Sequence, residues 1–438
     1  MVFADGNPGN GPKVAMRFPD FRASAPGRTL QHRNFRLYTG GNLASLLGTR
    51  TQEIASGWLV WTLTGEATWL GAIALAEIVP RFLVWPWAGV LADRVDRRRL
   101  AMIFQSIALV AAALIAVVTA LDVVQVWMVV ICHGVFGVCL GFWEPSRQAL
   151  LPEVVPKADL TPAVALSSVI AQSSRVFGPA VAGLIIVTFG ITAAFVFNAI
   201  SKCSVIVAVH LMDLPPFQPR AGQRRGIAGE TMEAVRYVAA HPGIGPLILS
   251  IFIFMSTVRP IIDLFPAFAD AVFAQGPGGL SMLNGFLGAG ALVGGLWASW
   301  RGALKGLVTV MTAATGVGAV GILLFALTEH WGFALGCCVF AGFGIIVQSI
   351  AAQTLLHCGV DDAVRGRVFS LYSMINGGAP GVGAFAMGIA ADRLGLHIPV
   401  AAGAVIGLGL CAWFLWRRKR LAAILEIPPE EKAAAKAA

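Results

Sequence analysis

The sequence predicts an all-α integral membrane protein with twelve transmembrane helices in two six-helix halves. Two features of its composition indicate this class. Hydrophobic residues make up 57% of the 438 positions and only 13% are charged, whereas a soluble domain carries about 25% charged residues. A third feature is the order of the chain, in which long apolar stretches alternate with short polar ones. Lipid is therefore the expected solvent for most of the surface.

Each spanning helix needs about 20 predominantly apolar residues, and helices are required because lipid cannot satisfy open backbone groups. Twelve stretches of the chain meet this requirement. They are residues 36–61, 69–91, 100–121, 126–149, 164–188, 192–212, 246–270, 280–300, 305–327, 331–356, 368–391 and 397–416.

The Lys and Arg residues give these spans an orientation, because basic residues collect in cytoplasmic loops. Loops near positions 65, 123, 190, 276 and 329 contain none, and Arg393 is the exception in the sixth loop of this set. The alternate loops hold Arg17, Arg22, Arg28, Arg33, Arg36, Arg94, Arg97, Arg98, Arg99, Arg147, Lys157, Arg220, Arg224, Arg225, Arg236, Arg301, Lys305, Arg365, Arg367 and Arg417 to Arg420. Both termini are therefore predicted to be cytoplasmic, in a multi-pass protein of a bacterial-type inner (plasma) membrane.

The spans and the longest polar segments divide the chain into five parts. The N-terminal part lacks the apolar stretch of a cleaved signal peptide. In the linker between the halves, residues 227–240 predict a short amphipathic helix at the membrane surface. The predicted parts are a cytoplasmic tail (1–32), a first six-helix bundle (33–212), a cytoplasmic linker (213–245), a second six-helix bundle (246–416) and a C-terminal cytoplasmic tail (417–438).

The two halves resemble each other at an offset of roughly 200 residues. Residues 178–183 match residues 379–384, and the pair Phe136-Gly137 matches Phe343-Gly344. Such internal repeats are typical of transporters whose site lies between halves related by a pseudo-two-fold axis.

The loop between the second and third spans carries a distinctive pattern. Residues 89–99 contain a Gly, an Asp-Arg pair and then paired basic residues. This pattern resembles the signature loop of the major facilitator superfamily. Asp96 stands where that family usually has Gly, and the counterpart near Arg301 in the second half lacks the Asp. The matching residues are Gly89, Asp93, Arg94, Arg97 and Arg98.

The fifth span resembles the Gly-Pro antiporter motif of the same superfamily. The motif contains Arg175, Gly178, Pro179 and Gly183. The resemblance implies a helix that bends at Gly178-Pro179 as one end of the bundle closes. The alternative is close packing alone, since small residues let helices approach each other.

Four further segments narrow the resemblance to one branch of the superfamily. Residues 34–36, 45–48, 151–156 and 365–368 resemble a branch that includes the enterobactin exporter and macrolide-type efflux proteins. This implies proton-coupled efflux of a small amphipathic molecule, a drug or a siderophore, by alternating access with the major facilitator fold. The implied partners are that molecule and the lipid bilayer, with no nucleic acid, and the chain is expected to be a monomer. No cofactor is implied, since the proton gradient would drive transport.

Several charged residues fall inside the predicted spans, where each costs about 2.5–3.5 kcal/mol on insertion scales. They are Arg50, Glu53, Glu77, Arg81, Arg175, Lys202, Arg259 and Asp263. Three acid–base pairs have i,i+3 or i,i+4 spacing, which places both side chains on one helical face. They are interpreted either as ion pairs that lower the cost of burial or as titratable groups that line a cavity.

Glu53 and Asp263 are the leading candidates for proton coupling, with Arg50 and Arg259 beside them. Both carboxylates fall near the middle of the first and seventh spans. In the superfamily that the chain resembles, these spans face each other across the cavity. A buried carboxylate must pair with a base or take up a proton, which makes it a coupling device.

For three other charged residues, a structural role competes more strongly with a role in the cavity. They are Glu77, Arg81 and Lys202. Glu77 lies nearer the outer end of the second span, so a structural pair with Arg81 competes with a cavity role. Lys202 has no obvious local partner, and a packing or snorkelling role is equally consistent with the sequence. Gln52 is a candidate for a polar contact in the cavity.

The cytoplasmic ends of the second and fourth spans form a candidate gate. Asp93 and the basic residues after it are expected beside Glu144 and Arg147, where ion pairs would hold that side closed. The alternatives are that the basic residues only anchor the membrane topology and that Glu144-Pro145 only ends the fourth helix.

Other function classes have little support in the sequence. An importer of a nutrient or metabolite with the same fold is the main alternative. An enzyme is not predicted, because the chain has no HExxH or GxSxG motif, and it has no Walker A motif for ATP. The seven Cys form no CxxC pair, so no metal site is predicted. His133, His210 and His357 are interpreted as core residues, and the glycines at 316–321 as helix-packing positions.

Overall fold

The structure is a computed structural model, and it describes residues 25–214, 227–302, 304–361 and 364–426. These residues form helices and turns, and no strand occurs among them. Ten helical segments in this part of the chain are long and apolar enough to cross a membrane. The protein is therefore an all-helical, multi-pass membrane protein.

The first part of the chain begins with a short helix and continues into long ones. Two 3-10 turns, Leu151–Glu153 and Lys157–Asp159, connect α5 to α6. The helices are α1 (Ala25–Thr29), α2 (Arg33–Thr64), α3 (Ala67–Arg94), α4 (Arg97–Ala120), α5 (Val126–Leu150), α6 (Leu160–Phe189) and α7 (Ile191–Leu211).

The second part begins with the linker helix. A π-helical segment, Phe268–Val272, continues α10. The helices are α8 (Ile227–Ala240), α9 (Ile244–Thr257), α10 (Ile261–Ala267), α11 (Gly276–Arg301), α12 (Leu307–Leu327), α13 (Trp331–Gly359), α14 (Arg365–Leu394) and α15 (His397–Leu425).

Two of the twelve predicted spans are not among the ten apolar segments. The span 36–61 lies within α2, which is long enough but contains charged side chains such as Arg50 and Glu53. The span 164–188 lies within α6, which contributes a shorter apolar stretch, Phe177–Phe189.

Two segments predicted outside the spans, the linker and the C-terminal tail, contain helices. The amphipathic helix expected at 227–240 is α8, with the same bounds. Helix α15 continues to Leu425, inside the segment predicted as the C-terminal tail. Glu426, which follows it, accepts hydrogen bonds from Gly306 N and Val308 N at the start of α12, at 2.6 and 2.7 Å. This contact satisfies backbone donors that a helix start leaves open.

The seventh predicted span is interrupted rather than continuous. Helix α9 ends at Thr257 and α10 begins at Ile261, with Pro260 between them. Pro has no N–H and its ring clashes with the preceding turn, so it ends a helix. The resulting break at 258–260 changes which side chains share a face.

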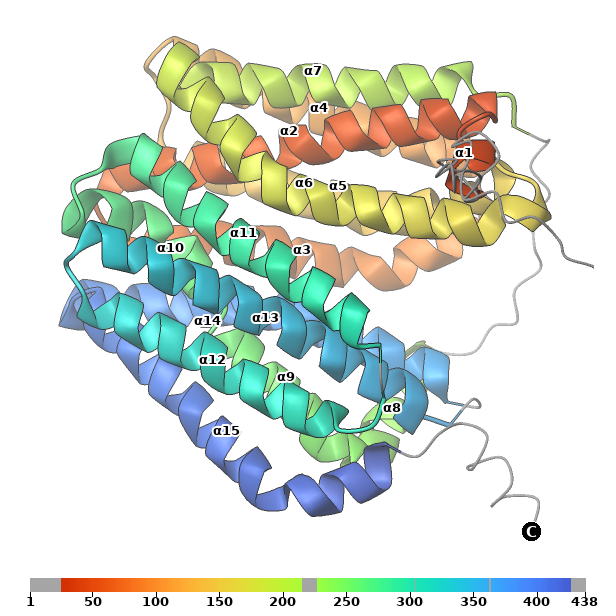
Figure 1. The fold of residues 1–438 in the computed structure, drawn as a ribbon. Coiled ribbons are helices and arrows are strands. Elements are labelled where there is room, and N and C mark those ends of the chain that lie inside the picture. The colour runs from red at the N-terminus through yellow and green to blue at the C-terminus, as the bar shows by residue number, and fades with distance from the viewer. Residues whose placement is uncertain (1–24, 215–226, 303, 362–363, 427–438) are drawn as a thin grey trace, which may run out of the picture.

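The long helices form two groups that lie side by side (Figure 1). The first group is α2 to α7 and the second group is α9 to α15. In the first group α3 packs on α5, and α4 packs on α5 and α7; in the second, α11 packs on α13, and α12 packs on α13 and α15. The groups meet where α3 packs on α14 and α6 packs on α11.

The bundle has two ends, the basic end and the far end. The basic end contains α1, α8 and the turn at Val95, and lies at the right of Figure 1. The far end contains the turns at Gly65, Gly190 and Gly395, which have positive φ values of 66°, 82° and 84°. The two groups diverge toward the basic end in Figure 1.

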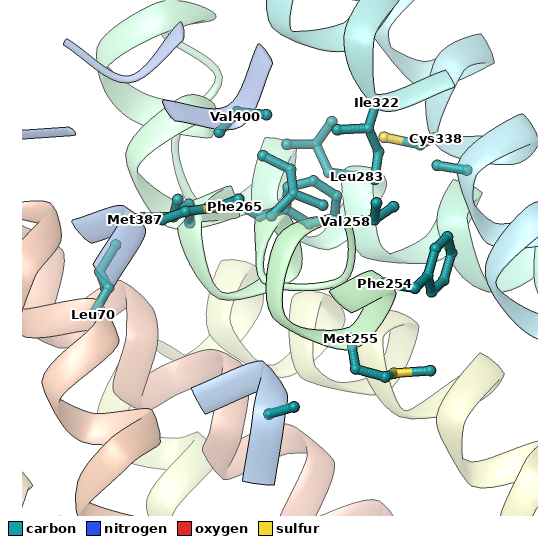
Figure 2. Close-up of a cluster of buried hydrophobic side chains, with 14 of the residues drawn as sticks. Leu70, Phe254, Met255, Val258, Phe265, Leu283, Ile322, Cys338, Met387 and Val400 are labelled. Atoms are coloured by element: carbon teal, nitrogen blue, oxygen red, sulfur yellow. The ribbon is translucent and has the colours of Figure 1, made fainter. Parts of the chain in front are cut away.

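The second group has an aromatic core around α10. Phe265 and Phe268 are at most 1% exposed, and each lies against Phe325 of α12, with ring centroids 5.7 and 5.0 Å apart. Figure 2 shows Phe265 among side chains from neighbouring helices, including Leu283 and Ile322. Since lipid tails are as apolar as these side chains, close van der Waals packing is what stabilises such a core.

Glycines allow several helices to touch through their backbones. The predicted packing role of the glycines at 316–321 is confirmed, since Gly318 lies against Gly344 of α13. On the contact between α3 and α14, Gly71, Gly381 and Gly388 lie so close to the partner helix that an added Cβ would overlap with it. Small residues at such contacts are the usual means of close approach in membranes.

Candidate functional site

A small, partly open cavity lies inside the first group of helices. Side chains from α2, α3, α4, α5 and α7 line it, and Phe104, Phe136 and Trp143 give part of it an aromatic surface. Its polar lining residues are Thr49, Gln52, Glu53, Glu77, Gln105, His133, Asn198 and Lys202. Polar groups at this depth are expensive to bury, so they mark a candidate functional site.

The ion pair between Arg50 and Glu53 is confirmed. Arg50 Nη1 donates to Oε2 of Glu53 at 2.5 Å. Both side chains are partly exposed, at 31% and 34%. The aliphatic part of Arg50 lies against Gly178 of α6, where an added Cβ would overlap with it. The space that Gly178 leaves therefore accommodates the stem of Arg50.

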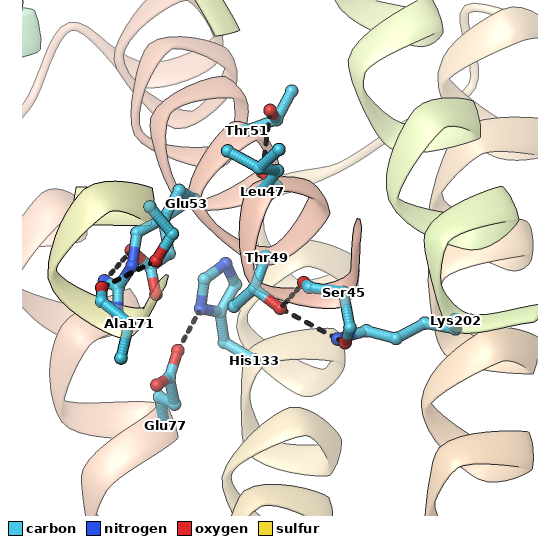
Figure 3. Close-up of polar contacts among 11 residues, drawn as sticks. Ser45, Leu47, Thr49, Thr51, Glu53, Glu77, His133, Ala171 and Lys202 are labelled. Atoms are coloured by element: carbon cyan, nitrogen blue, oxygen red, sulfur yellow. Dashed lines mark hydrogen bonds and ion pairs between the residues drawn. The ribbon is translucent and has the colours of Figure 1, made fainter. Parts of the chain in front are cut away.

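The structure does not show the ion pair with Arg81 that one interpretation gave to Glu77. Glu77 Oε2 lies 3.3 Å from Nδ1 of His133 on α5, as Figure 3 shows. The guanidinium of Arg81 lies over the Trp85 ring, 5.9 Å from its centroid. Within the described residues, Arg81 makes no ion pair with Glu77.

The approach of α5 to α3 explains the contact between Glu77 and His133. Gly137 lies against the backbone of Glu77, and an added Cβ would overlap with that carbonyl oxygen. His133 is one helical turn before Gly137, so it lies on the face of α5 that contacts α3. His133 is 5% exposed, and the interpretation of this residue as ordinary core misses its carboxylate partner.

Gly137→Ala should disrupt this contact. The added methyl group has to displace backbone rather than a flexible side chain, and such overpacking costs about 1–3 kcal/mol or more. We expect a clear loss of monodisperse protein and a lower Tm in detergent. Gly285→Ala is the matched control on α11, since its Cβ would meet nothing within 4 Å. An unchanged Tm for Gly137→Ala would show that the helices can separate without loss.

Arg259 and Asp263 do not form the predicted i,i+4 ion pair in the described structure. The break at Pro260 lies between them, so Arg259 is in the turn and Asp263 is in the first turn of α10. The charge of Arg259 nevertheless acts on Asp263, and those of Glu53 and Glu77 act on it more weakly. Asp263 is therefore in the electrostatic range of these residues without being among those that line the cavity.

Lys202 has partners that lie on another helix. Its Nζ donates to Thr49 Oγ1 at 2.8 Å and to Ser45 Oγ at 3.2 Å. One turn away, the Asn198 amide donates to Gln52 Oε1. The sequence contains a signal for these contacts, because Ser45, Thr49 and Gln52 recur at helical spacing on α2 and Asn198 and Lys202 do so on α7.

The signature loop lies at the basic end, between α3 and α4. Gly89, Asp93 and Arg94 belong to α3, but their side chains are outside the described residues, and the expected contact of Asp93 with Glu144 therefore stays a prediction. Asp96 is the N-cap of α4 and accepts from Arg98 N at 2.9 Å. An Asp in place of the usual Gly therefore caps the third span.

Ion pairs from neighbouring residues hold the basic end of the first group together. Arg97 pairs with Glu153 of the turn after α5, and the Arg98 guanidinium donates to the His210 carbonyl of α7. Glu144 and Arg147 pair with each other at 2.8 Å. All of these contacts lie within the first group.

The Gly-Pro motif packs against both groups. Gly178 lies beside Arg50 in the first group, and Gly183 lies against Ser281 of α11 in the second. Pro179 is inside α6, and the side chain of Arg175 is outside the described residues.

Two acidic residues join the groups at the far end. Asp392 of α14 accepts from Ala67 N at 2.7 Å and from Thr68 N at 2.9 Å. Trp61 Nε1 donates to Asp270 Oδ2 at 2.9 Å. Glu66, the N-cap of α3, makes no capping side-chain hydrogen bond, so Asp392 supplies the cap from the other group.

A family profile described as transmembrane secretion effector matches residues 24–432. The chain belongs to this family. This family includes the branch of the major facilitator superfamily that the motifs of the chain resemble.

Curated relatives of this secretion-effector protein are transporters from bacteria. Macrolide efflux protein A of Streptococcus pyogenes is 25% identical over 374 residues, which cover 84% of this chain and 92% of the relative. A staphyloferrin A transporter of Staphylococcus aureus is 26% identical, over 80% of this chain and 87% of the relative. An enterobactin exporter of Shigella boydii is 25% identical, over 81% of each chain.

Solved structures show the same fold at lower identity. The nucleoside transporter NupG superposes with a TM-score of 0.68 at 13% identity, over 87% of this chain and 99% of that structure. A bacterial homologue of ferroportin in an inward-facing state also gives 0.68, at 16% identity, over 87% and 98%. The secretion-effector chain therefore has the fold of this group of transporters.

Proposed function

We propose that the chain is a secondary active exporter of a small amphipathic molecule, a drug or a siderophore, driven by the proton gradient across a bacterial inner membrane. The observation that carries the proposal is the cavity inside the first group, where Glu77, His133 and Lys202 converge among membrane-spanning helices. Buried ionisable groups of this kind are typical of proton-coupled transport. The relatives named as macrolide and siderophore transporters support the direction and the class of substrate.

The proposed architecture is twelve spanning helices in two halves related by a pseudo-two-fold axis, acting as a monomer. Six spans are α2 to α7, and the other six are α9 with α10 and then α11 to α15. The repeated packing order supports this division, since α3 on α5 corresponds to α11 on α13, and α4 on α7 corresponds to α12 on α15. The contact of α3 with α14 likewise corresponds to that of α11 with α6.

Alternating access is the proposed mechanism of transport. The hydrogen bonds of Asp392 and Trp61 join the groups at the far end, while the groups diverge toward the basic end. With the basic end in the cytoplasm, this arrangement corresponds to a state closed to the outside. Opening to the outside requires these bonds to break, and Asp93 with the basic residues after it would hold the cytoplasmic side closed in that state.

Proton coupling would use the carboxylates that meet near the cavity. Glu77 beside His133 and Glu53 beside Arg50 can each exchange a proton when a substrate or a conformational change alters the partner. The charge of Asp263, in the second group, interacts with those of Glu53 and Glu77.

Transport in inside-out vesicles tests the proposal. An imposed pH gradient, acidic inside, should drive accumulation of at least one compound from a panel of siderophores and drugs. Accumulation should stop when a protonophore collapses the gradient. Gradient-driven movement only in the opposite direction would favour the importer, and no movement of any compound with any gradient would contradict secondary transport.

The proposed topology has its own test. An enzyme reporter that is active only in the periplasm should be inactive when fused after Ala438 and active when inserted at Asp122 in the turn between α4 and α5. The basic loops dictate this orientation. Activity of the C-terminal fusion, or equal activity of both fusions, would contradict cytoplasmic termini.

A further inference from the structure

Lys202 forms no ion pair with a carboxylate in the described structure. The side chain is 5% exposed, and its two contacts are with the neutral hydroxyls of Ser45 and Thr49. An ammonium group has three N–H donors, so these contacts leave one without an acceptor among the described residues. A buried cation in this condition favours a negatively charged partner.

The acidic groups that line the same cavity already have basic partners. Glu53 is paired with Arg50 at 2.5 Å, and Glu77 lies 3.3 Å from His133. With His133 protonated, the balance of charge inside the cavity leaves the amine of Lys202 as the unmatched group.

Two further side chains present hydrogen-bond donors to the cavity. Gln52 is 4% exposed and receives a hydrogen bond at its amide oxygen from Asn198, which leaves its NH₂ group available. His133 faces Glu77 through Nδ1, and its Nε2 is buried without a hydrogen bond, so the protonated imidazole has a free Nε2–H donor. In Figure 3 His133 lies between Glu77 and Thr49. The cavity thus combines a cation with free N–H donors.

We propose that this cavity binds an oxygen anion, a carboxylate or a phenolate, carried by the molecule that the protein exports. Lys202 supplies the opposite charge, and Gln52 and His133 donate hydrogen bonds to the same group. Phe104 and Trp143 in the lining suit an aromatic or other apolar body attached to it. The inference rests on the proposed export function, since it assigns the acidic head of the exported molecule.

Three compounds of nearly equal shape and different charge test the inference. Benzoate is the anion, benzamide is the neutral analogue and benzamidine is the cation. Full-length protein in lipid nanodiscs is titrated with each, and binding is followed by tryptophan fluorescence, because Trp143 lines the cavity. Benzoate should bind at least about tenfold more tightly than either analogue, since hydrogen bonds to charged groups contribute more than neutral ones. Equal binding of the three, or tighter binding of benzamidine, would overturn the inference without any variant.

Variants then assign the preference to Lys202. Lys202→Met should remove the preference for benzoate, and Lys202→Arg should retain it. Lys157→Met is the matched control, since this exposed lysine lies at the basic end and should leave the preference unchanged. A folded Lys202→Met protein that still prefers benzoate tenfold would refute the assignment. If Lys202→Met does not fold, a folded Lys202→Arg protein that has lost the preference would refute it instead.

The binding test separates this inference from the function on which it rests. It is made at equilibrium without a gradient. Charge-selective binding by a protein that transports nothing would support the anion site and contradict the export function. Proton-driven export by a protein without charge selectivity would support the export function and contradict the anion site.

Discussion

Glu77→Gln should abolish uphill export driven by a pH gradient and leave downhill exchange of substrate largely intact. The amide keeps the size of the carboxyl group but cannot gain or lose a proton, so the protein can still change conformation but cannot couple it to the gradient. The carboxylate is placed for this role because it lies 3.3 Å from His133 beside the cavity. The measurement is gradient-driven accumulation in proteoliposomes, compared with counterflow in the same preparation.

Glu53→Gln and Asp263→Asn belong in the same experiment. These are the two carboxylates that the sequence places first, and we expect each to impair uphill transport as well. Arg81→Gln is the control for Glu77, since it removes a nearby charge without removing a carboxyl group and the guanidinium lies over Trp85, and it should have a smaller effect. Full uphill transport by Glu77→Gln together with its loss in Glu53→Gln would return Glu77 to a structural role.

Asp392→Ala should shift the protein toward a state that is open at the far end. The wild-type carboxylate accepts hydrogen bonds from Ala67 N and Thr68 N, where the start of α3 carries partial positive charge. Hydrogen bonds to charged groups contribute about 1.5–3 kcal/mol each, and about 1.4 kcal/mol changes a population tenfold. Loss of both should therefore raise the open population by about tenfold or more.

Distances between spin labels measure this shift. Labels at Thr188 and Glu329 report on the far ends of the first and second groups, in a protein whose native cysteines have been replaced. The distribution should gain a longer component in Asp392→Ala and not in Asp122→Asn, a control at an exposed acid of the same end. Identical distributions in all three proteins would mean that other contacts keep the far end closed.

Local patterns in the sequence predict the features that depend on one helix. The bounds of α8 follow from amphipathic spacing, and the pair of Arg50 with Glu53 follows from i,i+3 spacing on α2. The same rule fails for Arg259 and Asp263, because Pro260 interrupts the helix between them. Spacing is also not sufficient in a continuous helix, since Glu77 and Arg81 of α3 lie against His133 and Trp85 instead of each other.

Contacts between helices account for the parts of the site that the sequence does not predict. Glu77 and His133 are 56 positions apart, and their contact depends on how closely α5 approaches α3 at Gly137. Lys202 finds Ser45 and Thr49 across the interface of α2 with α7. A polar stripe on each helix is visible in the sequence, but the choice of facing partner is set by packing in three dimensions.

The close contact between α3 and α14 has a consequence for the rate of the transport cycle. At the far end of this seam, Gly71 and Gly388 bring the backbones of the two helices into contact, with little interlocking of side chains there. Sliding or rocking of one helix over the other therefore needs little change of rotamer, and steric friction along the seam should be low. The activation barrier for separation would then be concentrated in the few polar bonds at its far end, so small chemical changes near Asp392 should alter the rate of the cycle more than large apolar changes along the seam.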